Sequence, residues 1–66
     1  MDESMIEDVK AYFVNQELRL QYEIDFWADE LRRFPIPSVA SSYGAALAAH
    51  LAFLEFRSDM EQLLQL

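Results

Sequence analysis

The side chains of this chain that could do chemistry are one histidine and a set of carboxylates. His50 is the single histidine of the 66 residues and there is no cysteine, so the chain cannot build a thiolate or multi-histidine metal site alone. Di-iron sites in helical bundles use Glu-x-x-His pairs, but no carboxylate lies three or four residues from His50, and Glu55 is five away. We therefore expect no metal, no cofactor, and a structural or surface role for His50.

Two pairs of carboxylates would each share one side of a helix. Glu23 and Glu30 are seven residues apart, and Asp25 and Asp29 are four apart. Paired carboxylates serve acid–base catalysis when a cleft shifts their pKa values, but along an acidic helix they are usually a solvated face. No nucleophile is placed among a base and an orienting acid, and there is no glycine-rich phosphate loop. We expect no catalytic residues and no enzyme activity.

Two uninterrupted arms must position these side chains. Proline disfavours helical geometry in the residue before it, and Pro35 and Pro37 are the only prolines of the chain. We predict a helix over about 4–33, a link at 34–38 and a helix over about 39–65 with Ser38 as its N-cap. Matched arms and a short link are typical of an antiparallel helical hairpin, so the sequence predicts a single all-α domain over 1–66.

The first arm carries helix signals at both ends. Ser4 and Glu7 have the spacing of a capping box, in which each side chain bonds the backbone N–H of the other. Acidic residues crowd its start, and Arg32 and Arg33 lie near its end, which suits the helix dipole.

The stretch LRLQYEIDF, residues 18–26, alternates apolar and polar residues and leaves a strand open as an alternative. Such a strand has no partner within the chain, although it could pair with its own copy in a dimer. On a helix the apolar residues of the arm instead form two rows. The main row, expected to face the second helix, is Ile6, Val9, Phe13, Leu20, Ile24, Trp27 and Leu31. The second row is Val14, Leu18, Tyr22 and Phe26. We favour the continuous helix.

The second arm is apolar around most of its circumference. One stripe is expected to face the first helix and contains Ala40, Tyr43, Leu47, Leu51 and Leu54. Another stripe contains Ala45, Ala49, Ala52, Phe56, Met60 and Leu63. Alanine is also simply a good helix former, which is the alternative explanation of the small residues. A helix that is apolar on most sides is buried on most sides, and one neighbouring helix cannot do this.

We therefore predict a homodimer, most simply a four-helix bundle of two hairpins. Its interface would contain the second row of the first arm and the second stripe of the second arm. On the flanks of the main row, Glu17, Gln21, Asp25 and Arg32 would set register and partner choice, while Arg19 and Arg57 could pair with acids across an interface.

The charge narrows the classes of partner. A net charge of −7 repels nucleic acid and anionic membranes, while a hydrophobic fraction of 53% is typical of a folded chain. The first ten residues are acidic, unlike a secretory signal, and the most apolar stretch, residues 43–56, is shorter than the roughly 20 residues that span a bilayer. We expect a cytoplasmic protein that binds neither nucleic acid nor membrane.

The expected function is a small non-catalytic interaction module, a regulator, adaptor or inhibitor, that binds itself and another protein. Two alternatives remain open. One is an acidic mimic of nucleic acid that inhibits a DNA- or RNA-binding protein, and the other is a structural subunit of a larger complex.

Overall fold

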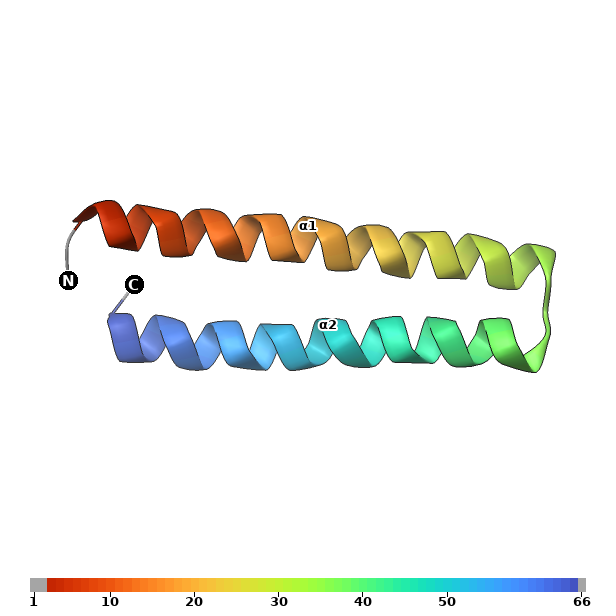
Figure 1. Ribbon diagram of the computed structural model, residues 1–66. Coiled ribbons are helices and arrows are strands. Elements are labelled where there is room, and N and C mark those ends of the chain that lie inside the picture. The colour runs from red at the N-terminus through yellow and green to blue at the C-terminus, as the bar shows by residue number, and fades with distance from the viewer. Residues whose placement is uncertain (1–2, 66) are drawn as a thin grey trace.

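The computed structural model describes residues 3–65 as an antiparallel hairpin of two long helices (Figure 1). Helix α1 spans Glu3–Arg33 and helix α2 spans Pro37–Leu64. The hairpin is a rod with principal extents of 48 × 17 × 11 Å and a radius of gyration of 15.2 Å. A compact domain of this length would have a radius of gyration of about 11 Å. The predicted all-α hairpin is confirmed, and its elongated shape leaves much of each helix uncovered.

Residues 18–26 lie inside α1, so the strand alternative is wrong. The helix places the alternating apolar residues on two sides of one cylinder, and it has acidic Glu3 in its first turn and Arg32 and Arg33 in its last, as its dipole favours. The prediction of Ser4 as the N-cap of a capping box is wrong. Because α1 begins at Glu3, Ser4 lies within the first turn and not at the N-cap, and the residue before Glu3 lies outside the described residues.

The link between the helices is shorter than predicted and comprises residues 34–36. At the C-terminal end of α1, the N–H of Phe34 donates a hydrogen bond to the carbonyl of Glu30 over 2.7 Å. Pro37 then opens α2, because a proline at the first helical position lacks an N–H that would have no partner there anyway.

The cap of α2 is Ile36, in the extended conformation that a following proline favours, and its carbonyl accepts the N–H of Ala40 over 3.0 Å. The prediction of Ser38 as N-cap is wrong, because Ser38 lies in the first turn, where its carbonyl accepts a bond from the Ser42 hydroxyl over 3.1 Å. At the other end, α2 stops at Leu64 and Gln65 closes it in a left-handed conformation, with φ of 58°.

The inward side of α1 agrees with the predicted main row. Phe13 and Leu20 are buried, and the other members of that row are half-buried. From α2, Ala46 is the buried residue, and the rings of Phe53 and Phe56 meet Phe13 edge-on at centroid distances of 6.2 and 6.3 Å. The core is thus a thin seam between the two helices, thickest around Phe13.

The face of α2 predicted to contact α1 is correct at Tyr43, which is half-buried, but wrong at three of its other members. Leu47 is 38% exposed, Leu51 is 62% exposed, and Ala40 is also exposed. The true inward line steps alternately by four and three residues, the spacing of a helical pair that packs like a coiled coil. All its members are buried or half-buried: Val39, Tyr43, Ala46, His50, Phe53, Arg57, Met60 and Leu64. Two of them, His50 and Arg57, are polar. The apolar pattern of the sequence therefore does not reveal this line.

Candidate interaction surface

Among residues 3–65, one ion pair joins the two helices, between Glu17 of α1 and Arg57 of α2. The Nε of Arg57 also lies 3.3 Å from Oε1 of Glu61, and its guanidinium carbon lies 6.0 Å from the centre of the Phe53 ring. Glu17 was predicted to set register and Arg57 to pair with an acid, and the structure brings these two together. Arg57 therefore satisfies its charge inside the seam, although it occupies an inward position.

The other predicted flanking residues bond within α1. Gln21 donates to Asp25 over 3.1 Å, and Arg19 donates to Gln16 over 3.0 Å. A further set of side chains near the link is ion-paired at the surface: Asp29 lies 3.2 Å from Arg32 and 3.1 Å from Arg33, and Glu30 lies 4.0 Å from Arg33. Each of the two carboxylate pairs considered above thus has one member that is ion-paired with arginine. This member is Asp29 in the pair with Asp25, and Glu30 in the pair with Glu23.

The Glu17–Arg57 pair provides a first test of this arrangement. The two side chains are 40% and 30% exposed, so solvent screens their attraction and we expect a coupling free energy of about 0.5–1 kcal/mol. A double-mutant cycle of Glu17→Gln and Arg57→Gln, followed by urea unfolding, measures it. Purely additive effects of the two substitutions would contradict a contact between these side chains.

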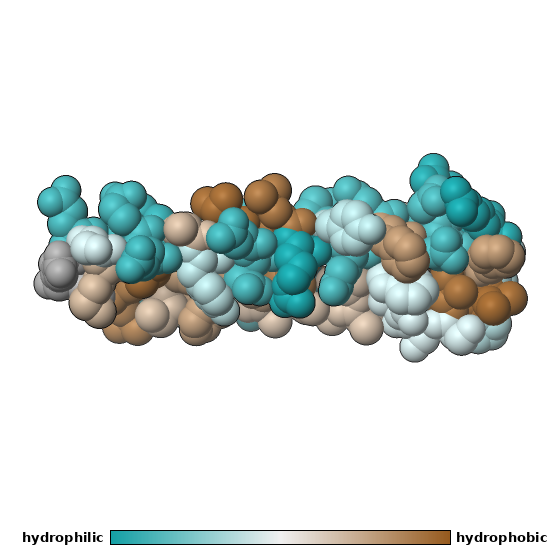
Figure 2. All heavy atoms as spheres, turned by 45° about the horizontal axis from the view of Figure 1, so that its top comes forward, coloured by the Kyte–Doolittle hydropathy of each residue, from teal (hydrophilic) through white to brown (hydrophobic). Residues whose placement is uncertain are grey.

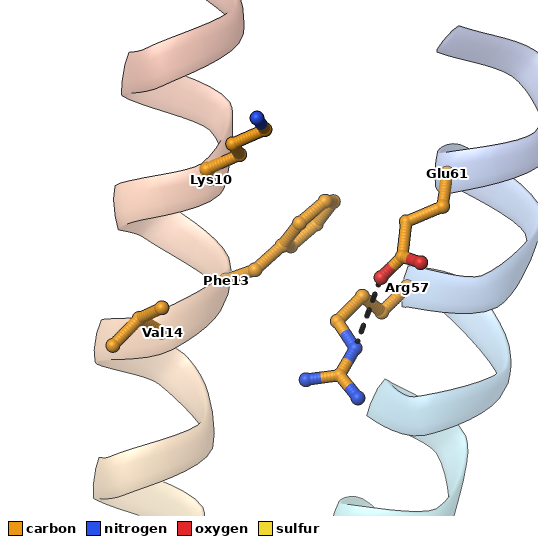
Figure 3. Close-up of a pocket in the computed structure, with 5 residues that line it drawn as sticks. All are labelled: Lys10, Phe13, Val14, Arg57 and Glu61. Carbon is orange, nitrogen blue, oxygen red and sulfur yellow. Dashed lines mark ion pairs between the residues drawn. The ribbon is translucent and has the colours of Figure 1, made fainter. Parts of the chain in front are cut away.

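A shallow open groove of about 360 Å³ lies beside this pair (Figure 3). Its lining consists of Lys10, Phe13 and Val14 from α1 with Arg57 and Glu61 from α2. In Figure 3, Phe13 points toward α2 while Val14 points away from it. Because Arg57 is already paired with two carboxylates, the groove offers mainly apolar side chains at its floor and a neutralised rim. Such a groove suits an apolar side chain of another protein.

His50 lies on the inward line of α2, and its Nε2 is buried without a hydrogen-bond partner. Within residues 3–65, no cluster of three or more histidine, aspartate or glutamate side chains has the geometry to hold a metal ion.

The predicted interface residues are exposed in the hairpin, with one exception. Val14, Leu18, Tyr22, Phe26, Phe56 and Leu63 are large apolar side chains that the hairpin leaves exposed, and the three alanines are exposed as well. Met60 is half-buried on the inward line. Figure 2 shows hydrophobic side chains exposed between hydrophilic ones at several places along the rod. Their role as an interface stays a prediction.

These residues lie on more than one side of the hairpin. The row from Val14 to Phe26 advances four residues at a time, so it moves about 40° around α1 at each step and about 120° in all. Val14 lies at the edge of α1 beside the groove that Glu61 also lines. Residues seven apart on a helix share a side, so Leu54 and Leu47 follow Glu61 on this edge of α2. Tyr22 and Phe26 point progressively away from it.

We therefore distinguish two apolar sides of the rod. The leucine side consists of Val14 of α1 with Leu47, Leu51 and Leu54 of α2. The alanine side consists of Ala45, Ala49, Ala52, Phe56 and Leu63, and on it Ala45 and Ala49 line a second hollow together with Glu23, Trp27 and Ser42. Sequence reasoning found most of the alanine side but missed Leu47 and Leu51 as surface residues, because it had placed them against α1.

The area of exposed surface is large for the size of the chain. The hairpin exposes 4971 Å², whereas a compact monomer of its mass exposes about 4,300 Å². The excess, about 650 Å², is close to the roughly 800 Å² that each partner contributes to a standard protein interface.

Helix α2 is longer than the apolar stretch that was expected to be too short to span a bilayer. Its 28 residues contain an 18-residue window with a mean hydropathy of 1.2, of which 6% is buried, so α2 is long and apolar enough to cross a bilayer. The expectation that the apolar stretch is too short considered residues 43–56 alone, and the helix extends well beyond them. Length and hydropathy do not separate this case from a helix covered by protein.

No family model matches the chain, and the searches of curated proteins and of solved structures also returned no match.

Proposed function

We propose that this protein is a small non-catalytic interaction module that acts as a helical homodimer and regulates, bridges or inhibits another protein by occupying part of its surface. One observation carries the proposal: the hairpin exposes large apolar side chains on two sides, while among the described residues only Phe13, Leu20 and Ala46 are buried. An uncovered apolar surface of this extent is typical of a protein that is covered by another.

The two apolar sides would provide one surface for dimerisation and a second surface for binding another protein. A twofold dimer uses the same surface of both copies, so one side of the rod is covered and the other stays available. The available side would accept a partner with an apolar patch, because small and apolar side chains make up the exposed stripe from Ala45 to Leu63.

The alternative of an acidic nucleic-acid mimic has less support. A mimic needs carboxylates spaced like phosphates along both arms, but most acidic residues lie in the first thirty positions and the segment from Pro37 to Leu54 contains none.

The oligomeric state tests the proposal directly. Light scattering between 1 and 100 µM should give about twice the mass of one chain, and the melting temperature by circular dichroism should rise with concentration, because association stabilises the folded state by mass action. A folded monomer across this range, with a melting temperature independent of concentration, would overturn the proposal.

A further inference from the structure

Gly44 is a glycine that the hairpin itself does not require. It lies inside α2, its φ is not positive, and a Cβ built on it would meet nothing within 4 Å. Glycine inside a helix costs about 1 kcal/mol relative to alanine, because it loses more backbone freedom on folding. Since neither the backbone conformation nor a neighbour in the hairpin explains it, a close approach from outside is the remaining structural use of a missing side chain.

Leu51 is the natural counterpart of this gap. It lies seven residues after Gly44, hence on the same side of α2, and it is 62% exposed. The helix therefore presents a gap and a protruding side chain two turns apart along one line. A surface with this pattern is complementary to its own copy when the two helices run in opposite directions.

We propose that a second copy of this chain packs antiparallel across α2, with Leu51 of each subunit set against the partner subunit's Gly44. This inference rests on the proposed homodimer and names its surface, the leucine side of the rod. In a twofold dimer a contact from Leu51 to Gly44 implies the reverse contact, so both gaps are filled at once. The alanine side then stays free.

The distribution of charge favours α2 as the meeting surface and an antiparallel direction. From Pro37 to Leu54, α2 contains no aspartate, glutamate, lysine or arginine, whereas α1 carries acidic residues along its length. With Leu51 against Gly44, Glu55 of each subunit lies near the position of the partner subunit's Ala40. A parallel pair would instead set Glu55 and Asp59 against their own copies, where like charges in an interface repel.

The amount of surface agrees with this arrangement. The hairpin exposes about 650 Å² more than a compact chain of its mass, which is nearly the share that one partner contributes to a standard interface. The dimer also gives α2, apolar on most of its circumference, a neighbour on a second side.

A reciprocal exchange tests the contact. Gly44→Leu fills the gap and Leu51→Gly removes the side chain that enters it, so each alone should raise the dimer dissociation constant at least about tenfold. The double variant carries both changes and restores one leucine against one glycine at each site. Its dissociation constant should return to within about threefold of the unchanged protein. Sedimentation equilibrium measures the constants, and circular dichroism checks that each variant stays helical.

Matched controls separate failure of this inference from failure of the proposed function. Ala49→Leu enlarges a small residue on the alanine side and should leave the dimer unchanged. A dimer that Ala49→Leu disrupts and Gly44→Leu does not would overturn the inference while the homodimer stands. Weakening by both single changes without recovery in the double variant would also overturn it. An unchanged protein that is monomeric, or that binds neutral phosphatidylcholine vesicles as a monomer, would overturn inference and proposed function together.

Discussion

Replacing Phe13 with alanine is expected to lower the free energy of unfolding by about 3–5 kcal/mol. Phe13 is the one aromatic residue that the hairpin buries, and the rings of Tyr12, Phe53 and Phe56 surround it. A domain of this size has a total stability of only about 3–10 kcal/mol, so this loss is a large fraction of the total. Circular dichroism at 222 nm during urea titration measures the loss.

Tyr22→Ala is the matched control for that experiment. It removes another aromatic ring of α1, but Tyr22 is 70% exposed and its ring meets only Phe26, at a centroid distance of 6.5 Å, in the described contacts. At protein concentrations that keep the chain monomeric, we expect a loss within about 1 kcal/mol. If Phe13→Ala were no more harmful than Tyr22→Ala, the seam around Phe13 would not be the core of the hairpin.

Replacing His50 with leucine is expected to raise the free energy of unfolding by about 1–3 kcal/mol. The buried Nε2 of His50 has no hydrogen-bond partner, and a buried polar group without a partner costs about this amount. Leucine fills similar space on the inward line and leaves no polar atom to satisfy. Thermal unfolding followed by circular dichroism measures the change.

His50→Asn is the control, because it keeps a polar side chain at the same position and should give no gain. A loss of stability on His50→Leu would contradict the expectation and would indicate that the imidazole makes a favourable contact in the assembled protein.

The sequence was sufficient for the helical hairpin and for the inward side of α1. There the main apolar row has more members than the second row, so the orientation that buries the main row removes the most apolar surface from water. The start of α2 was predicted at about residue 39 and lies at Pro37, since a proline can begin a helix when the residue before it, here Ile36, supplies the first carbonyl.

The orientation of α2 could not be obtained in the same way. Apolar residues surround this helix, so rotating it exchanges one apolar stripe for another at little cost in buried area. What selects the inward line is the pairing of Arg57 with Glu17 and the packing of Phe53 on Phe13. Both are contacts between distant residues, which periodicity within one helix does not reveal. The same error placed Leu47 and Leu51 inside and so concealed the leucine side.

The hairpin has one closed end and one open end, since α1 begins where α2 finishes (Figure 1). A force applied at these two neighbouring ends would break the contacts between the helices one after another and not all at once. The rod is therefore mechanically weak in this direction, whatever its stability at rest. Separation would start at Ile6 and Leu64 and reach Phe13 early, which makes the thickest part of the seam the main barrier to peeling.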